Sequence, residues 1–152
     1  MKTRILIISK YFPYYHINRG KETNFIRKMR LGNKIHTIRA NYDYWKKVEE
    51  EVKKGDSFVS LRTWNGKPRH SKQVEIKKLY DINVEKLFFS NKNFRPYIVG
   101  EKKNKEICLN VLAINDGLRL PNFIEWFNHY DHNKPFVIIH FTNFKYEYNK
   151  EL

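Results

Sequence analysis

The feature that most constrains the fold of this chain is a series of short segments with strand-like sequence, separated by turn-forming residues. Runs rich in β-branched and aromatic residues recur at short spacing, and Gly, Pro, Asn or charged residues bound them. They predict strands over residues 5–9, 34–39, 57–64, 72–79, 84–89, 97–99, 107–114 and 136–144. This spacing favours an α+β domain built on a curled sheet or small β-barrel. A parallel α/β fold is disfavoured, because the sequence has no Gly-rich phosphate loop.

Apolar residues at helical spacing predict three short peripheral helices, over residues 23–31, 45–54 and 120–130. Thr23 can cap the first helix, and Gly32 supplies the positive φ angle that commonly ends such a helix. Residues 11–20, which include a proline and a glycine, read as an irregular loop laid over the domain.

The apolar content of the chain predicts a folded protein. Hydrophobic residues make up 41% and aromatic residues 16% of its 152 residues, which suffices for one buried core. The single cysteine, Cys108, lies in an apolar setting that favours a core strand position, and it cannot form an intramolecular disulfide. A reducing, cytoplasmic location fits this usage. The leading apolar run, residues 5–8, is too short for a signal peptide or a membrane span, so we expect no membrane partner.

A strongly basic balance points to polyanions as partners. Thirty Lys and Arg face sixteen Asp and Glu, giving a formal net charge of +14. A positive field of this size attracts nucleic acid by releasing its counterions. We expect nucleic acid, RNA before DNA, or a nucleoside. The alternative is an ordinary solvated surface in a basic, Lys-rich chain.

Residues 32–39 hold the densest group of chemically active side chains. A regular strand places Thr37 and Arg39 on one face and Lys34 on the other. Lys34 and Thr37 can therefore meet only if Lys34 belongs to a turn begun at Gly32, or if a bulge re-aims it. If they meet, Thr37 has the hydroxyl for nucleophilic attack and Lys34 the amine to deprotonate it. Otherwise Lys34 is a turn lysine, Thr37 a strand residue and Arg39 half of an ion pair.

This segment resembles a known signature. Gly-x-Lys-x-x-Thr-x-Arg, followed about twenty residues later by Lys-x-Gly-Asp, is similar to the motif of the ASCH family of PUA-like domains, and the matching positions are Gly32, Lys34, Thr37, Arg39, Lys53 or Lys54, and Gly55-Asp56. The resemblance implies a PUA-like (ASCH) domain over 1–152 with an N-terminal extension of about 1–24. Small enzymes of this family remove the acetyl group from acetylcytidine, which implies a Lys34 base and a Thr37 nucleophile.

The resemblance also implies a carboxylate acid, and Asp116 occupies the comparable place. The family enzymes carry Glu there, so this chain presents a carboxyl group on a shorter side chain, and catalytic geometry tolerates little displacement. Followed by Gly117, Asp116 is equally well explained as a turn residue.

Two further groups of residues suit nucleic-acid contact. Tyr42 and Tyr44 follow Arg39 closely and can stack on bases, whereas Trp45 shares helical spacing with apolar residues and belongs in the core. A predicted hairpin adds an aromatic ring and cations fit for phosphate contact: Arg62, Trp64, Lys67, Arg69 and Lys72.

We expect no metal and no cofactor. His129 and His132 lie in a predicted turn without a partner cysteine, and His140 fits a hydrogen-bonded position in a core strand. The leading prediction is therefore binding of RNA or of a modified nucleobase or nucleoside in a PUA-like pocket. Amidohydrolysis of an acylated nucleoside is the enzymatic alternative. A basic interaction protein of a mobile element, binding a host factor, is the third.

Overall fold

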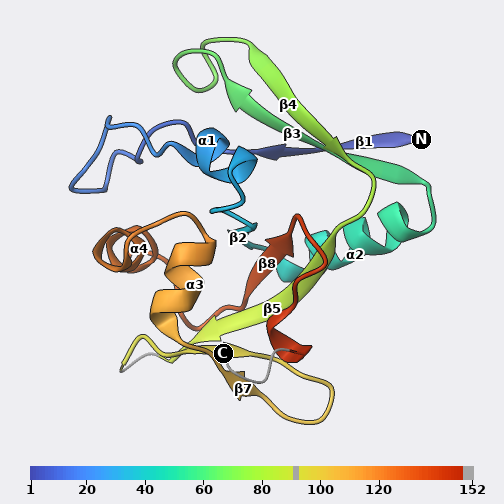
Figure 1. Ribbon diagram of the computed structural model, residues 1–152, viewed down its shortest axis with the longest axis vertical. Helices are drawn as coiled ribbons and strands as arrows, with labels where there is room; N and C mark the ends of the chain where they lie inside the picture. The colour runs from blue at the N-terminus through green and yellow to red at the C-terminus, as the bar shows by residue number, and fades with distance from the viewer. Residues whose placement is uncertain (91–92, 149–152) are drawn as a thin grey trace.

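Two open β-sheets and four short helices make up the fold. The computed structural model describes residues 1–90 and 93–148 (Figure 1). One sheet has the order β1-β3-β4 and the other β2-β8-β5-β6-β7. The strands are β1 (Lys2–Ile7), β2 (His36–Ala40), β3 (Ser57–Trp64), β4 (Gln73–Leu79), β5 (Asn83–Phe89), β6 (Pro96–Ile98), β7 (Lys105–Glu106) and β8 (Phe136–His140). The α+β prediction is confirmed, and among the described residues the strands do not close into a barrel.

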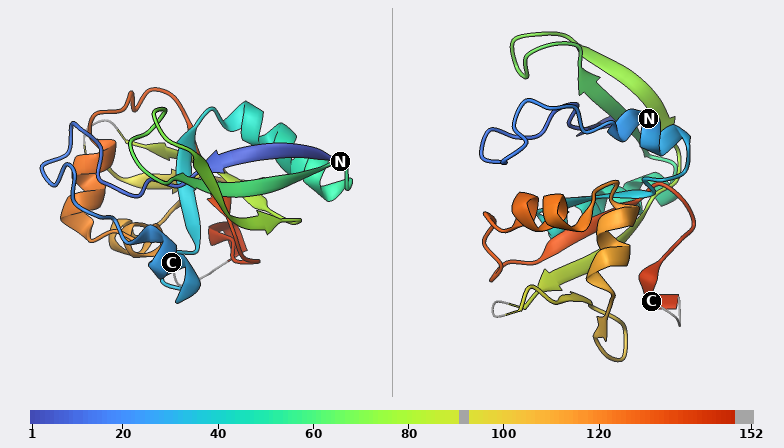
Figure 2. Two further views of the ribbon diagram at one scale, coloured as in Figure 1. Left: turned by 90° about the horizontal axis from the view of Figure 1, so that it is seen from above. Right: turned by 60° about the vertical axis from the view of Figure 1, so that its left-hand side comes forward.

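The helices fill the space beside and between the sheets. They are α1 (Phe25–Arg30), α2 (Tyr42–Lys53), α3 (Leu109–Asn115) and α4 (Leu120–Phe127), with a 3₁₀ turn at Tyr146–Tyr148. Helix α2 contacts β3 of the small sheet and β5 and β8 of the large one. Helices α3 and α4 contact each other and lie together beside the large sheet (Figures 1 and 2). Helix α2 therefore joins the two sheets, while α3 and α4 lie beside the large sheet.

The chain start is built into the small sheet. Strand β1 pairs with β3 in parallel, whereas the remaining pairs are antiparallel. A parallel partner requires a long crossover, which α1, β2 and α2 supply. Residues 2–7 of the predicted extension are thus a sheet edge, and the irregular loop begins after them.

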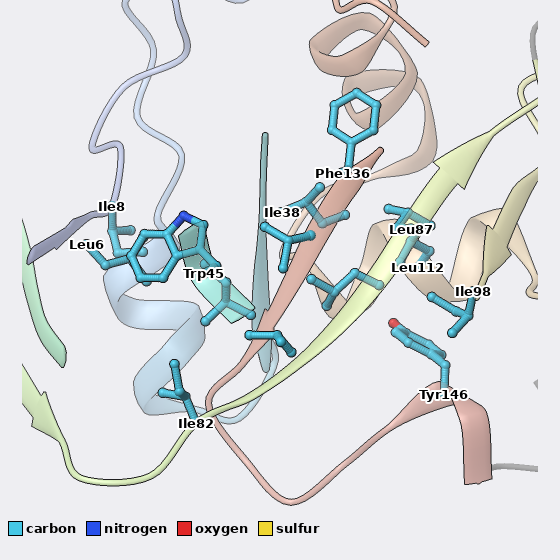
Figure 3. Close-up of a cluster of buried hydrophobic side chains, with 14 of the residues drawn as sticks. Leu6, Ile8, Ile38, Trp45, Ile82, Leu87, Ile98, Leu112, Phe136 and Tyr146 are labelled. Atoms are coloured by element: carbon cyan, nitrogen blue, oxygen red, sulfur yellow. The ribbon is translucent and has the colours of Figure 1, made fainter. Parts of the chain in front are cut away.

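One hydrophobic core lies between the two sheets. Leu6 and Ile8 approach Trp45 of α2, and Ile38 and Phe136 continue the apolar layer across the large sheet (Figure 3). Each of these side chains is buried, as predicted for Trp45. Burial of this shared apolar area is what holds the two sheets together.

Most predicted elements are confirmed, but the strand expected over residues 107–114 is wrong. These residues form helix α3, and Leu109, Leu112 and Ala113 place their apolar side chains at helical spacing. A short, almost continuous apolar run occurs both in buried strands and in buried helices. Its sequence pattern therefore could not distinguish a helix from a strand here. Cys108 precedes this helix and is exposed, which corrects the predicted core position.

The predicted 136–144 strand ends early, at His140. Within residues 1–90 and 93–148, no helix combines the length and hydropathy needed to cross a bilayer.

Replacing Glu49 by alanine is expected to lower the free energy of unfolding by about 1–3 kcal/mol, because a buried backbone N–H loses its acceptor. The Glu49 carboxylate is buried on α2 and accepts from the N–H of Val84 at 2.6 Å. Urea unfolding should compare Glu49→Ala with Glu50→Ala, whose side chain is exposed on the same helix. Equal stability of the two variants would contradict this role.

Candidate functional site

The predicted motif begins with a tight helix exit. Gly32 has a φ angle of 77°, and the N–H groups of Asn33 and Lys34 both donate to the carbonyl of Lys28, at 2.7 and 3.1 Å. Lys34 thus belongs to the turn, and β2 begins two residues later. The turn that an encounter between Lys34 and Thr37 requires is present. Whether the two side chains meet therefore depends on the direction in which each one points.

The side chain of Lys34 goes to the end of helix α3. Its Nζ donates to the carbonyl of Asp116 at 2.7 Å and lies 3.4 Å from the Asp116 carboxylate. Lys28 donates in the same way to the carbonyl of Gly117 at 2.7 Å. Both carbonyls directly follow Asn115, the last residue of α3, and cations are favoured at the C-terminal end of a helix because the helix dipole is negative there. The two lysines therefore cap the C-terminal end of α3.

The close packing of Lys34 and the backbone conformation both favour glycine at position 117. Its φ angle is 87°, and a Cβ atom built there would lie 3.2 Å from side-chain atoms of Lys34 and of Phe25. The Lys34 ammonium also lies 4.2 Å from the centre of the Phe25 ring. Burial lowers the pKa of Lys34 from 10.5 to about 8, Asp116 opposes this shift, and Arg39 reinforces it.

Asp116 also holds His36, the first residue of β2. The His36 Nδ1 lies 3.2 Å from the Asp116 carboxylate, and Nε2 lies 2.6 Å from the Tyr146 hydroxyl. A carboxylate only accepts, so Nδ1 carries the proton and Nε2 accepts from Tyr146. Asn115 donates in turn to the Tyr146 oxygen at 2.9 Å. Burial lowers the pKa of His36 to about 4, although Asp116 opposes the shift, and the ring is neutral.

A second buried pair lies next to this network. His140 Nε2 donates to the Glu85 carboxylate at 2.7 Å, which agrees with the predicted hydrogen-bonded core position. The His36 and His140 rings meet edge to face with centroids 5.5 Å apart. Glu85 also accepts from the backbone N–H groups of Tyr146 and Glu147. These contacts attach the 3₁₀ turn to the large sheet.

Thr37 and Arg39 lie on the opposite face of β2 from His36, as strand alternation requires. The Arg39 guanidinium donates to the Thr37 hydroxyl at 2.6 Å and to the carbonyl of Ile7 at 2.5 Å. Lys34 and Thr37 thus have different partners, and among the described residues they form no hydrogen bond to each other. The predicted catalytic residues split into two groups: Lys34 with Asp116, and Thr37 with Arg39.

Arg39 lines a cavity of about 440 Å³, here called the Arg39 cavity. Its wall consists of Ile7, Ser9, Pro13, Tyr15, Ile38, Arg39, Ala40, Trp126, Phe127, Tyr130 and Phe136. None of these described residues is acidic. Burial lowers the pKa of Arg39, yet the guanidinium keeps its charge because arginine titrates far above neutral pH. The cavity therefore offers one cation within aromatic and aliphatic walls.

The loop over residues 10–24 is fastened to helix α4 and forms one wall of this cavity. The Tyr15 hydroxyl donates to the carbonyl of Trp126 at 3.1 Å, and burial raises the pKa of Tyr15. His16 is fully buried and bonds to the carbonyl of Asn122 at 3.0 Å, and the Asn18 amide donates to the Asn122 side chain at 2.8 Å. The aromatic wall is therefore held in place by the α4 backbone.

A second cavity, of about 570 Å³, lies between this loop and the β3–β4 hairpin tip, and is here called the hairpin cavity. Of the hairpin residues predicted to contact nucleic acid, Trp64 and Lys67 line it. Arg62 instead donates to Ser60 and Gln73 of its own hairpin. Arg69 and Lys72 are exposed and lie outside the lining.

Tyr42 and Tyr44 also lie outside both linings. Tyr42 packs under the ammonium of Lys86, 5.1 Å from the ring centre, and Tyr44 meets Trp45 edge to face. In the part of the chain that the structure describes, no group of three or more His, Cys, Asp or Glu side chains could hold a metal ion.

Sequence reasoning missed the aromatic residues that build the Arg39 cavity. Tyr15 is far in sequence from Trp126 and Tyr130, and the pattern over residues 120–130 predicts only a helix. One signal was available: the loop has the unusually aromatic run Tyr11-Phe12-Pro13-Tyr14-Tyr15. Comparisons with protein-family models, with curated proteins and with solved structures give no match to this chain.

Acidification from pH 6.5 to 4 is expected to destabilise the protein through His36. In this window the unfolded chain binds a proton that the buried neutral ring does not, so the free energy of unfolding falls by up to about 3 kcal/mol. Urea unfolding across this range should show a shallower fall for His36→Gln, because that variant lacks the titrating ring. His70→Gln, which alters an exposed histidine, is the control. Parallel curves for the protein and His36→Gln would refute the assignment.

Proposed function

We propose that this protein binds a nucleobase in the Arg39 cavity, presented by RNA or as a modified nucleobase or nucleoside, on a PUA-like domain. The observation that carries the proposal is a charged arginine in the wall of an aromatic-lined cavity whose described lining residues include no Asp or Glu. The volume of about 440 Å³ lies within the range of small-ligand sites. Aromatic rings stack on bases, and an arginine fork donates to the acceptor atoms of a base edge or phosphate.

Preorganisation supports binding at this site. Arg39 is held by Thr37 and by the carbonyl of Ile7, and Tyr15 by the backbone of α4. Groups already fixed in place lose little conformational entropy when a ligand arrives. The net charge of +14 adds a long-range attraction for RNA that weakens as salt increases.

Arg39→Met is expected to weaken binding of a single-stranded RNA 12-mer of mixed sequence by about 10- to 100-fold, because a charge-assisted contact contributes about 1.5–3 kcal/mol. Arg119→Met removes the same charge from an exposed position at the start of α4 and should bind as the intact protein does. Fluorescence anisotropy at several salt concentrations measures both variants. Equal losses in the two variants would mean that net charge, and not the cavity, binds the RNA.

Amidohydrolysis is the second candidate, and one observation favours it. Burial lowers the pKa of Lys34 to about 8, so part of the population holds a neutral amine that can accept a proton near neutral pH. Hydrolysis would require Lys34 to leave the carbonyl of Asp116 and approach Thr37. The arrangement therefore supports binding better than chemistry.

Incubation with acetylcytidine tests this second candidate. The hydrolase would release acetate at a rate that Lys34→Ala and Thr37→Val both reduce to background. Thr37→Val matters because Lys34→Ala removes a buried partner of Asp116 and lowers stability. Release by the intact protein at the background rate would exclude hydrolysis of this substrate and leave the binding proposal unaffected.

A further inference from the structure

We propose that the ligand is a single strand of RNA rather than a free nucleoside, with two adjacent nucleotides bound in the two cavities. The nucleotide next to the one in the Arg39 cavity occupies the hairpin cavity. This inference rests on the proposed function and adds to it a second binding site and a substrate class.

The two cavities share a wall. Ile7, Ser9 and Pro13 line both of them, so the cavities lie on either side of one short stretch of chain. In Figure 1 and in the right-hand view of Figure 2, the loop over residues 10–24 lies between the β3–β4 hairpin tip and α4. A strand that leaves the Arg39 cavity over Pro13 enters the hairpin cavity directly.

The hairpin cavity carries the groups that a nucleotide needs. Trp64, Tyr11 and Tyr14 offer rings for stacking, and Lys10 and Lys67 offer cations for a phosphate. Tyr14 is 88% exposed, so its ring is available to a ligand. None of the described lining residues is acidic. Stacking rings interleaved with cations are the usual means of binding single strands.

Thr63 gives an independent sign of a missing partner. This residue lines the hairpin cavity, is only 6% exposed, and has a hydroxyl without any hydrogen-bond partner. A buried polar group without a partner is costly, and most such groups in proteins are satisfied. The hydroxyl is buried, so a ribose hydroxyl or a base edge in the hairpin cavity would supply the missing partner once the Thr63 side chain rotates toward the cavity.

Competition experiments with the full chain test the inference. Nucleoside monophosphates and dinucleotides of the same bases compete against a labelled single-stranded RNA 12-mer of mixed sequence. We expect a dinucleotide to compete at least about tenfold better than a monophosphate. Trp64→Ala should remove this advantage, since one stacked base contributes about tenfold or more.

Thr63→Val provides a variant that keeps the fold. It replaces an unsatisfied hydroxyl by a methyl group of similar shape, so stability should stay equal or rise while the dinucleotide advantage falls. Trp64→Tyr keeps a stacking ring and should retain most of the advantage.

The outcomes separate this inference from the proposed function. Monophosphates that compete in an Arg39-dependent manner, without any dinucleotide advantage, would overturn the inference alone. RNA binding unaffected by Arg39→Met would overturn the proposed function. A deoxyribonucleotide 12-mer that competes as well as the RNA would overturn the assignment to RNA.

Discussion

The arrangement of the helices and strands around the site depends on the interactions of the buried Asp116 side chain. It accepts from His36 on β2 and lies beside the Lys34 ammonium, and the Asp116 carbonyl binds that same ammonium. Residues eighty or more positions apart in sequence are thereby joined, and the turn between α3 and α4 is fixed against the large sheet. Lys34 in the turn and His36 at the start of β2 are both bound here, so this end of β2 has a structural role.

The other face of β2 carries Thr37 and Arg39, which the proposed function assigns to the ligand site. Thr37 and Arg39 point away from Asp116, and Arg39 reaches the carbonyl of Ile7 at the end of β1. This contact joins the two sheets beside the Arg39 cavity. A single strand of five residues therefore separates a buried polar network from an open cationic cavity, and alternation of side chains is the reason.

The loop between β1 and α1 connects structure to function. Hydrogen bonds from Tyr15, His16 and Asn18 fasten it to α4, so the Tyr15 and His16 rings have fixed positions although the loop lacks regular secondary structure. Its two sides line different cavities. The β3–β4 hairpin completes the second of them with an aromatic ring and a cation, Trp64 and Lys67.

The sequence by itself determined the α+β class, most strands and helices and the buried Trp45, because these follow from local periodicity. It made a meeting of Lys34 and Thr37 conditional on a turn; that turn is present, and only the tertiary structure directs Lys34 to Asp116 and Thr37 to Arg39. It failed for residues 107–114, where a short apolar run is compatible with helix and strand alike. Only the tertiary structure decided that Lys34 binds at the C-terminal end of α3 and that Arg62 is bound within its hairpin. It also decided that Arg39 lines one cavity with Tyr15, Trp126 and Tyr130. These contacts join residues far apart along the chain, and local pattern carries no information about which distant surfaces will meet.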